Sequence, residues 1–340
     1  MKKFLSNIIR KNSQEDKSLF KVVLTQNERN SKLPDTFFKK FISSISQKDI
    51  FFYPNTKKLI NKIAKHHRIK PYNVLLTPGS DIGIKTIFET FDLKGKNIIT
   101  TNYFFGMYEV YSKLYETKLK KAVYSKNKFN IRKILNKIDQ DTQFIIIANP
   151  NSPVGDTYTA HELKTLLDTG IHLIIDEAYI ELSSAKSFIS KINEYKNLTI
   201  LRTFSKGYGA AGCRVGFIVS SKENIDYFSK FRFMYEISGI SMKYIEFILD
   251  NNLYFKRYFE KTLKNKNKFV NKLKSTKLHI IDSDSSWFFI KSSKLVKDMF
   301  SKNRIAIRET DHPYERGKWI KFNYDLKVEK TNILNDLLTI

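Results

Sequence analysis

Cysteine and long apolar runs are almost absent from this chain of 340 residues. Its one cysteine, Cys213, excludes a disulfide framework within the chain. The longest apolar runs have four or five residues, as at 144–148, whereas a membrane-spanning helix needs ~18. Near the amino terminus, Ser6, Asn7 and Arg10 interrupt the apolar core that a signal peptide needs. These absences exclude disulfide-stapled and membrane-spanning proteins and predict a cytoplasmic location.

Acidic residues are also few. The 34 aspartates and glutamates face 60 lysines and arginines, which gives a formal net charge of +26. Nucleic acid, an anionic membrane or an acidic substrate could each match such a charge. The lysines are spread from Lys2 to Lys330, however, and no helix-turn-helix or zinc-finger spacing occurs. We therefore expect solvated lysines that speed the capture of phosphorylated ligands, with neither a nucleic-acid nor a membrane partner.

Short apolar segments alternate with amphipathic ones, which predicts a folded α/β protein. Strands are expected at 74–76, 97–100, 144–148, 173–175, 198–201 and 215–219, and helices at 83–91, 107–115, 160–167 and 251–277. Several of these strands end in polar or glycine-rich turns. Ligands bind outside the carboxyl ends of strands in open α/β sheets, so these turns predict one shared site.

Three parts of the chain are expected. A lysine- and asparagine-rich helix, with Phe255, Phe259 and Leu263 at helical spacing, links a large domain to a small one. The small domain has strand candidates at 278–281 and 286–290, and residues 1–25 are expected to be mobile. The predicted division is an amino-terminal arm at 1–30, a large cofactor-binding domain at 31–245 and a small C-terminal domain at 246–340.

The segment 201–216 carries the strongest chemical signal. Ser205 and Lys206 follow an apolar strand, and Arg214 lies eight residues after the lysine. Such a lysine can form a Schiff base with a carbonyl, while Ser205 and Arg214 can converge on a phosphate. Pyridoxal 5'-phosphate (PLP), an aldehyde with a phosphate tail, needs all three. The segment therefore predicts PLP as the cofactor. His66 and His67 have no carboxylate at metal-ligand spacing, and no metal is expected.

Four other motifs precede this segment in a fixed order. They are a Gly-Ser-Asp turn at 79–81, an aromatic-Gly-Met-Tyr stretch at 105–108, Asn-Pro-Asn-Ser-Pro-Val-Gly at 149–155 and Asp-Glu-Ala-Tyr at 176–179. Together the five motifs resemble fold-type I PLP-dependent enzymes, and among these the histidinol-phosphate aminotransferase subgroup of class I and II aminotransferases. The resemblance extends from about residue 24 to residue 323. It implies a large domain with a mostly parallel sheet flanked by helices, a small α+β domain, and a homodimer.

The resemblance assigns roles to the catalytic candidates. Lys206 would be the Schiff-base lysine, and its freed amine would move the proton between substrate Cα and the C4' carbon of the cofactor. Asp176 would pair with the protonated pyridine nitrogen, because a carboxylate after an apolar strand needs a cationic partner. Tyr179 would hydrogen-bond the phenolate oxygen of the cofactor.

Two positions around the cofactor ring have rival candidates. Relatives often carry asparagine before the second proline of the Asn-Pro loop, where this chain has Ser152. We take Asn151 as the second donor to the phenolate oxygen, with Ser152 as the alternative. By resemblance, Phe105 stacks on the ring where relatives commonly have tyrosine, and Tyr103 is its rival.

The cofactor phosphate has candidates on two turns. Gly79-Ser80-Asp81 opens a helix, where backbone N–H groups form a natural anion site, and Ser205 and Arg214 add a hydroxyl and a charge. Tyr53, in Tyr53-Pro54, resembles the tyrosine that such enzymes lend across a dimer to the cofactor phosphate of the neighbouring subunit. A packed aromatic residue is the alternative for Tyr53.

The substrate end departs from the family pattern. Relatives carry two arginines thirteen residues apart that face the acidic group of the substrate; Arg308 matches the first, but Lys321 stands at the second. Lysine cannot grip a carboxylate with two parallel hydrogen bonds, but it can hold a phosphate as a point charge. Asn27, in the Asn27-Glu28 pair, matches another substrate-binding position of the family.

These features predict a PLP-dependent aminotransferase that acts on a small, anionic or phosphorylated amino or keto substrate. The alternative is a PLP-dependent decarboxylase of a phosphorylated amino acid, similar to threonine-phosphate decarboxylases, because the carboxylate grip decides which Cα bond breaks. A third possibility is a non-catalytic regulator with the same fold, which the presence of Lys206 disfavours.

Overall fold

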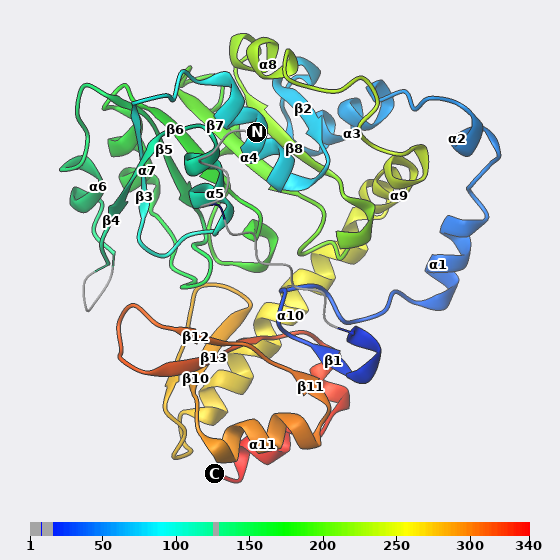
Figure 1. The fold of residues 1–340 in the computed structure, drawn as a ribbon. Helices are drawn as coiled ribbons and strands as arrows, with labels where there is room; N and C mark the ends of the chain where they lie inside the picture. Colours follow the sequence, from blue (N-terminus) through cyan, green and yellow to red (C-terminus); the bar gives the residue numbers. More distant parts are fainter. Residues whose placement is uncertain (1–7, 9–15, 125–128) are drawn as a thin grey trace.

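The computed structural model describes residue 8 and residues 16–124 and 129–340. A large unit with a central sheet lies above a small unit with its own sheet in Figure 1. The sheet of the large unit has seven strands, in the order β2 (Val74–Thr77), β8 (Gly216–Ser220), β7 (Leu198–Thr203), β6 (His172–Asp176), β5 (Thr142–Ala148), β3 (Asn97–Thr101) and β4 (Lys118–Ala122). Only β8 runs antiparallel to its neighbours β2 and β7, so the sheet is mostly parallel, as predicted.

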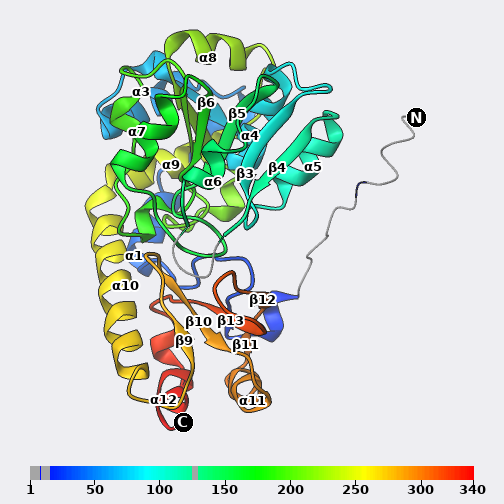
Figure 2. The same ribbon diagram turned by 90° about the vertical axis from the view of Figure 1, so that its left-hand side faces the viewer.

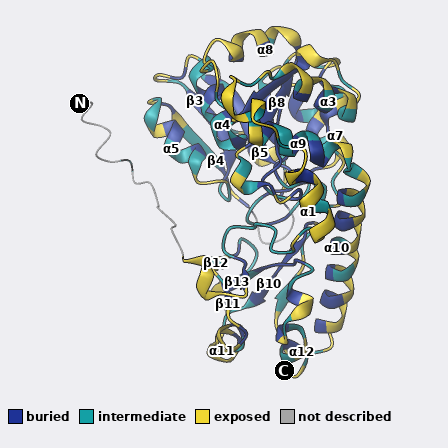
Figure 3. Ribbon diagram, turned by 90° about the vertical axis from the view of Figure 1, so that its right-hand side faces the viewer, coloured by how far each residue is buried: buried dark blue, intermediate teal, exposed yellow. Residues whose placement is uncertain are grey.

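Helices cover both faces of this sheet because its central strands are apolar on both sides. In β5, Ile146 packs into a core with α4 and α5, whereas Ile145 and Ile147 face the opposite core with α7 and α9. The helices of the large unit are α1 (Asp35–Ile42), α2 (Lys48–Phe51), α3 (Lys57–His67), α4 (Gly79–Thr90), α5 (Met107–Leu114), α6 (Arg132–Leu135), α7 (Ala160–Leu167), α8 (Lys222–Ser229) and α9 (Gly239–Asp250). Figure 3 shows the buried strands at the centre and exposed residues on the outer faces of these helices.

The long helix α10 (Asn252–Leu273) runs alongside both units (Figure 2). Its first half contributes Phe255 and Phe259 to the core of the large unit, and its second half contributes Phe269 and Leu273 to the core of the small unit. The predicted linking helix is thus present. Among the described residues, no helix is long and apolar enough to cross a membrane.

The small unit packs helices on an antiparallel sheet. Its strands, in spatial order, are β12 (Glu309–Asp311), β13 (Lys318–Asn323), β10 (Trp287–Lys291) and β9 (Ile280–Ile281), and its helices are α11 (Lys294–Lys302) and α12 (Ile333–Leu338). Short 3-10 helices occur at Lys17–Leu19, Pro71–Asn73, Ile180–Leu182, Ile189–Lys191, Ala211–Cys213 and Val328–Lys330.

The amino-terminal segment differs from the expected mobile arm. β1 (Val22–Val23) pairs in parallel with β11 (Ile305–Ala306), and Leu24 is buried with them in the core of the small unit. The expectation of mobility is therefore wrong for 22–24, because apolar burial and strand pairing fix these residues. Residues 1–7 and 9–15 lie outside the described residues, and the domain boundaries at 30 and 245 stay predictions.

Candidate active site

A cavity of about 240 Å³ lies at the carboxyl ends of β5, β6 and β7. The amino-terminal segment contributes Gln26 and Glu28 to its wall, and the turn that opens α4 contributes Ser80 and Asp81. The other lining residues are Phe105, Ala148, Ser152, Asp176, Ala178, Tyr179, Thr203, Ser205, Lys206, Ala211 and Arg214. The turns that follow the predicted strands thus meet in one cavity, as the position of ligands in α/β sheets predicts.

Asp176 is the last residue of β6 and is 6% exposed. Its Oδ2 accepts a hydrogen bond from the Tyr108 hydroxyl at 2.9 Å, and its Oδ1 accepts one from the Ala178 N–H at 3.0 Å. Burial raises the pKa of the Asp176 carboxyl, and these two hydrogen bonds offset only part of that effect. No cation lies within 4.0 Å of Asp176 among the described residues. Two hydrogen bonds therefore fix the carboxylate, and the charge of Lys206 lowers its pKa from beyond ion-pair distance.

Lys206 lies in the turn after β7, and its side chain lines the cavity. Its Nζ donates a hydrogen bond to the Gln26 carbonyl at 2.9 Å and lies 5.5 Å from the centroid of the Tyr179 ring. The amine is thus held on the side of the cavity that the amino-terminal segment covers.

The candidate phosphate residues converge as predicted from the sequence. Ser80 and Asp81 lie in the first turn of α4, and Arg214 Nη1 donates to Ser205 Oγ at 3.4 Å. Arg214 is exposed and has a left-handed backbone, with φ at 51°. These side chains offer a charge and two hydroxyls beside the amino terminus of a helix, which is the donor set that binds a phosphate.

Two glycines allow the turns of this site to approach each other. A Cβ at Gly79 would lie 2.6 Å from Arg214 Nη2, and φ at Gly79 is +77°. A Cβ at Gly216 would lie 2.7 Å from the Ser80 nitrogen. Because Gly79 has no side chain, the Arg214 guanidinium can approach the start of α4. Because Gly216 has none, β8 can approach the Ser80 nitrogen.

Tyr179 connects the cavity to the small unit. Asn27 Nδ2 donates a hydrogen bond to its hydroxyl at 3.1 Å, and Trp287 packs against its ring edge to face at 5.1 Å. Asn27 has a positive φ of 53°, which asparagine tolerates better than most residues. The structure thus brings Asn27 to Tyr179, although Asn27 itself does not line the cavity.

The loop at 149–155 contains the two candidates for the second donor to the phenolate oxygen, Asn151 and Ser152. Asn151 is 1% exposed, and its Nδ2 donates to the Tyr103 carbonyl at 2.9 Å and to Thr101 Oγ1 at 3.3 Å. Ser152, not Asn151, lines the cavity. The amide of Asn151 is used to hold the loop, so its place differs from the one expected of a ring donor.

The two candidates for stacking on the cofactor ring, Phe105 and Tyr103, also differ in their position relative to the cavity. Phe105 lines the cavity and is 43% exposed, whereas Tyr103 does not line it. Tyr103 packs edge to face on Tyr124 at 5.8 Å, and burial raises the pKa of its hydroxyl. The geometry therefore favours Phe105 over its rival.

Lys321 in β13 lies next to the cavity with its charge unpaired. Its Nζ is 3.8 Å from the centroid of the Trp287 ring and 5.8 Å from that of Tyr179, and it donates to Ser152 Oγ at 3.5 Å. No carboxylate lies within 4.0 Å of it among the described residues. Burial lowers the pKa of Lys321 well below the usual lysine range, and the charge of Lys206 lowers it further.

Arg308, the other expected substrate cation, does not lie at the cavity wall. Its side chain is exposed. It lies between β11 and β12, outside the strand that carries Lys321. The two expected substrate cations therefore differ in their surroundings.

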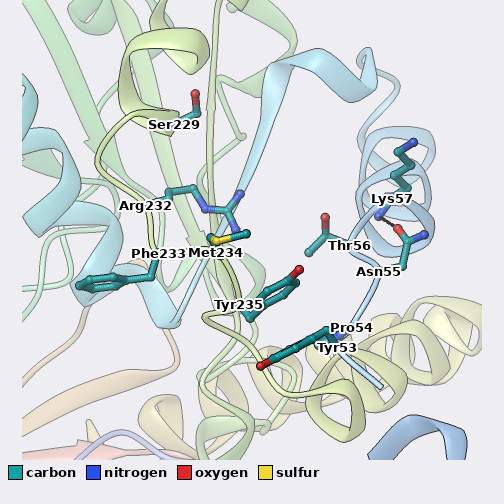
Figure 4. Close-up of a pocket in the computed structure, with 10 residues that line it drawn as sticks. All are labelled: Tyr53, Pro54, Asn55, Thr56, Lys57, Ser229, Arg232, Phe233, Met234 and Tyr235. Atoms are coloured by element: carbon teal, nitrogen blue, oxygen red, sulfur yellow. Dashed lines mark hydrogen bonds between the residues drawn. The ribbon is translucent and has the colours of Figure 1, made fainter. Parts of the chain in front are cut away.

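Tyr53 lies away from the cavity of its own chain. It is 77% exposed, and its ring stacks on that of Tyr235 at 4.1 Å and 17° (Figure 4). These rings line a surface groove of about 560 Å³ together with Arg232, Phe233 and Met234. Phe233 and Met234 are 80% and 81% exposed.

Several residues of the site went unnoticed in the sequence. Tyr108 belongs to one of the sequence motifs, which predicts no role for it, yet its hydroxyl holds Asp176. Trp287 contacts both Lys321 and Tyr179 through its ring, and it lies in none of the sequence motifs. Behind Asp176, the buried Arg202 pairs with Glu177 at 3.1 Å and Glu181 at 2.6 Å. Charged residues beside the Asp-Glu-Ala-Tyr and Ser-Lys motifs were the signal for this ion network.

The residues present fit PLP. The cavity has a buried carboxylate without an ion pair inside 4.0 Å among the residues described, a phosphate cradle that a Cβ at Gly79 would fill, and a lysine amine that lines the same space. Asp176 suits a pyridine nitrogen that carries a proton, and Ser80, Ser205 and Arg214 suit the phosphate. The fold and the cavity together define a PLP-dependent enzyme of fold type I.

The chain belongs to the aminotransferase class I and II family, whose model matches residues 20–336. Histidinol-phosphate aminotransferase of Staphylococcus saprophyticus is 30% identical to it over 254 residues, which cover 72% of each chain. The fold class, the PLP cofactor and the aminotransferase activity predicted from the sequence are confirmed.

Solved structures share the fold over nearly the whole chain. Histidinol-phosphate aminotransferase from Sinorhizobium meliloti, in complex with PLP, has a TM-score of 0.84 and 18% identity, and the match covers 100% of this chain and 95% of that one. L-threonine-O-3-phosphate decarboxylase from Porphyromonas gingivalis has a TM-score of 0.77 and 20% identity, and the match covers 94% of this chain and 98% of that one.

Proposed function

We propose that this aminotransferase acts on a small amino compound that carries a phosphate or another compact anionic group. The observation that carries the proposal is the half-buried amine of Lys321 beside the cavity, which has no carboxylate within 4.0 Å in the described part of the chain. An unpaired charge away from water is costly, so an anion brought by the substrate would offset that cost. A single ammonium suits a phosphate better than the planar grip that a carboxylate receives from arginine.

The residues of the cavity divide the work of the reaction. PLP supplies the aldehyde that captures the amine and a ring that withdraws electrons from Cα. Lys206 Nζ would take the proton from substrate Cα and return it on the cofactor side, and Asp176 would keep the ring nitrogen protonated. Tyr179 and Ser152 would bind the phenolate oxygen, and Phe105 and Ala178 would pack against the ring.

The phosphate of the cofactor would be held by Ser80, the Asp81 N–H, Ser205 and Arg214. These groups lie beside the first turn of α4, where backbone N–H groups and a guanidinium together favour an anion. Asn27, Lys321 and Arg308 would serve the substrate. Contacts with lining residues support two of these roles: Asn27 bonds to Tyr179, and Lys321 bonds to Ser152.

We also propose a homodimer in the cytoplasm. Ile50, Phe51, Phe52 and Tyr53 are each 62% to 77% exposed, and Tyr53 lines one groove with the Phe233–Tyr235 segment. Exposed large apolar side chains at a groove are typical of a protein–protein interface. A second copy that covers it would bring Tyr53 toward the cofactor phosphate of its partner. Sedimentation of the purified protein tests this: a monomer would contradict it.

The experiment that tests the reaction uses PLP-loaded protein and a panel of paired amines, each with and without a phosphate. The cofactor absorbance and the products, identified by mass spectrometry, are followed together. We expect the cofactor to convert to its amine form, with a keto product, fastest for phosphorylated members. Release of CO2 and an amine without this conversion would instead establish a decarboxylase, the alternative that the lysine at residue 321 keeps open.

A further inference from the structure

Arg29, two residues after Asn27, is held by a set of aromatic rings. Its Cζ lies 3.8 Å from the centroid of the Tyr258 ring, and 5.9 Å and 5.8 Å from those of Tyr254 and Phe255, all on α10. A guanidinium is planar and weakly hydrated, so it stacks on aromatic faces better than an ammonium does. The side chain thus fastens the amino-terminal segment to the helix that runs along both units.

Arg29 donates hydrogen bonds that orient its guanidinium, and no carboxylate among the described residues forms an ion pair with it. Its Nε donates to the Ser31 carbonyl at 3.0 Å and its Nη2 to the Tyr254 hydroxyl at 3.3 Å. Its Nη1 is buried, and it has no hydrogen-bond partner among the described residues. The position of the Arg29 guanidinium therefore depends mainly on its stacking against these rings.

The ring beneath Arg29 also belongs to a hydrogen-bond network. The Tyr258 hydroxyl donates to Asp325 Oδ2 at 2.9 Å, and Asp325 is 2% exposed. The same carboxylate accepts a hydrogen bond from the Asn30 N–H at 3.0 Å and another from the Ser31 hydroxyl. We call Arg29, Tyr258 and Asp325 the strap clamp, because together they fix the chain that follows Gln26–Glu28.

The stem of Arg29 rests on the turn that carries Lys206. A Cβ at Gly209 would lie 2.6 Å from Arg29 Cδ, so this close approach requires glycine, which also has φ at +71°. The Gly209 N–H donates to the Lys206 carbonyl at 2.9 Å, and Lys206 Nζ donates to the Gln26 carbonyl at 2.9 Å. The amino-terminal segment therefore contacts the Lys206 turn at its backbone and at its amine.

We propose that Arg29 is a positioning residue for Lys206. Through the strap clamp it holds the Gln26 carbonyl where that oxygen receives the Lys206 amine whenever the amine is free. The amine then stays within reach of substrate Cα during proton transfer, where a misplacement of about 1 Å can cost about a hundredfold in rate. This inference rests on the proposed role of Lys206.

The test compares purified, PLP-loaded Arg29→Met and Arg29→Lys proteins with the wild type. We expect Arg29→Met to lower kcat per bound cofactor by about tenfold to a hundredfold, with a much smaller change in KM. Arg29→Lys keeps the charge but loses the flat contact with Tyr258, so it should fall in between. Amide hydrogen exchange over residues 22–31 should become faster in Arg29→Met, with or without cofactor, while exchange in β5 and β6 stays unchanged.

Arg257→Met is the matched control, because Arg257 is an exposed arginine of α10, the helix whose rings hold Arg29. It should change neither kcat nor the exchange of residues 22–31. If Arg29→Met lowers only the melting temperature and leaves kcat per bound cofactor unchanged, the positioning role is overturned. Lys206→Ala separates the two claims: full turnover in that variant would overturn the proposed function itself, whatever Arg29 does.

Discussion

Asp176, which is buried, and Lys321, which is half-buried, are ionisable groups of opposite sign at two ends of one site. Neither has a counter-ion within 4.0 Å among the described residues, and burial shifts each pKa toward the neutral form. The pKa of Asp176 is raised, and that of Lys321 is lowered. Each of these two residues therefore has a charge that a ligand can pair. The protonated ring nitrogen of the cofactor would pair with Asp176, and an anionic group of the substrate would pair with Lys321.

The two ends differ in rigidity. Asp176 is fixed by two hydrogen bonds, at 2.9 Å and 3.0 Å. Lys321 has one long contact, 3.5 Å from Ser152, and otherwise rests on the face of Trp287. The cofactor end is thus preorganised, whereas the substrate end can adapt to the position of its anion.

The largest effect should come from removing the amine between these ends. Lys206→Ala should lower turnover at least about a thousandfold, because proton transfer at Cα loses its base. The cofactor should remain bound without a covalent link, since the phosphate cradle is intact. Absorbance spectra before and after dialysis check the link, and product formation checks turnover; retained turnover would contradict the mechanism.

Asp176→Asn should lower kcat by about a hundredfold or more, because the ring nitrogen loses its charged partner. In the cofactor-free protein the same change should raise the melting temperature at neutral pH. The raised pKa of Asp176 means that its ionised form costs stability above the folded pKa, and that this cost is absent below the unfolded value of about 3.9. The gain should therefore vanish as the pH falls toward 4.

Melting curves of the two cofactor-free proteins across that pH range measure this gain. Asp298→Asn, at an exposed carboxylate of α11, is the control and should not raise the melting temperature at neutral pH. A gain that persists in acid would show that charge burial is not its cause.

Lys321→Arg should change the pH dependence of substrate capture. In the wild type, kcat/KM for an anionic amine should fall as the pH rises through the lowered pKa of Lys321, because the neutral amine no longer attracts the anion. Arginine stays charged, so the variant should lose this decline and use carboxylate donors better. Steady-state rates against pH check it, and two identical profiles would mean that another residue holds the anion.

Tyr53→Phe should have the smallest effect, a loss of severalfold or about 1 kcal/mol in PLP affinity for one lost hydrogen bond. Because Tyr53 serves the neighbouring subunit in the proposed homodimer, mixing Tyr53→Ala with Lys206→Ala chains should restore active sites. Each mixed dimer would contain one site with both residues intact. A PLP affinity in the mixed dimers that is no higher than in the Tyr53→Ala protein would contradict the exchange across the interface.

The fold was predictable where strands are short, apolar and closed by turns. The runs at 144–148, 173–175 and 198–201 became β5, β6 and β7, because residues buried on both faces must be apolar. β4 was missed, since it is an edge strand rich in lysine, and β1 was missed because two valines give no periodicity.

The site was predictable to the extent that its residues share motifs. Lys206 and Arg214 are eight residues apart in one segment after β7, so their presence in the same cavity could be predicted. The contacts of Lys321 with Ser152 and Trp287 could not, because they join strands and loops far apart in the chain. The same holds for the seat of Arg29 on Tyr258, which requires the path of α10 to be known.

The most direct test of the account is the preference for a phosphorylated over an unphosphorylated donor amine, measured as a ratio of kcat/KM values. The ratio is compared between the wild type and Lys321→Gln, which keeps a polar side chain of similar length but removes the charge. The account predicts a high ratio in the wild type that falls by about tenfold to a hundredfold in the variant, as expected for one hydrogen bond to a charged group. An equal ratio in both proteins would contradict the claim that the unpaired ammonium selects an anionic substrate.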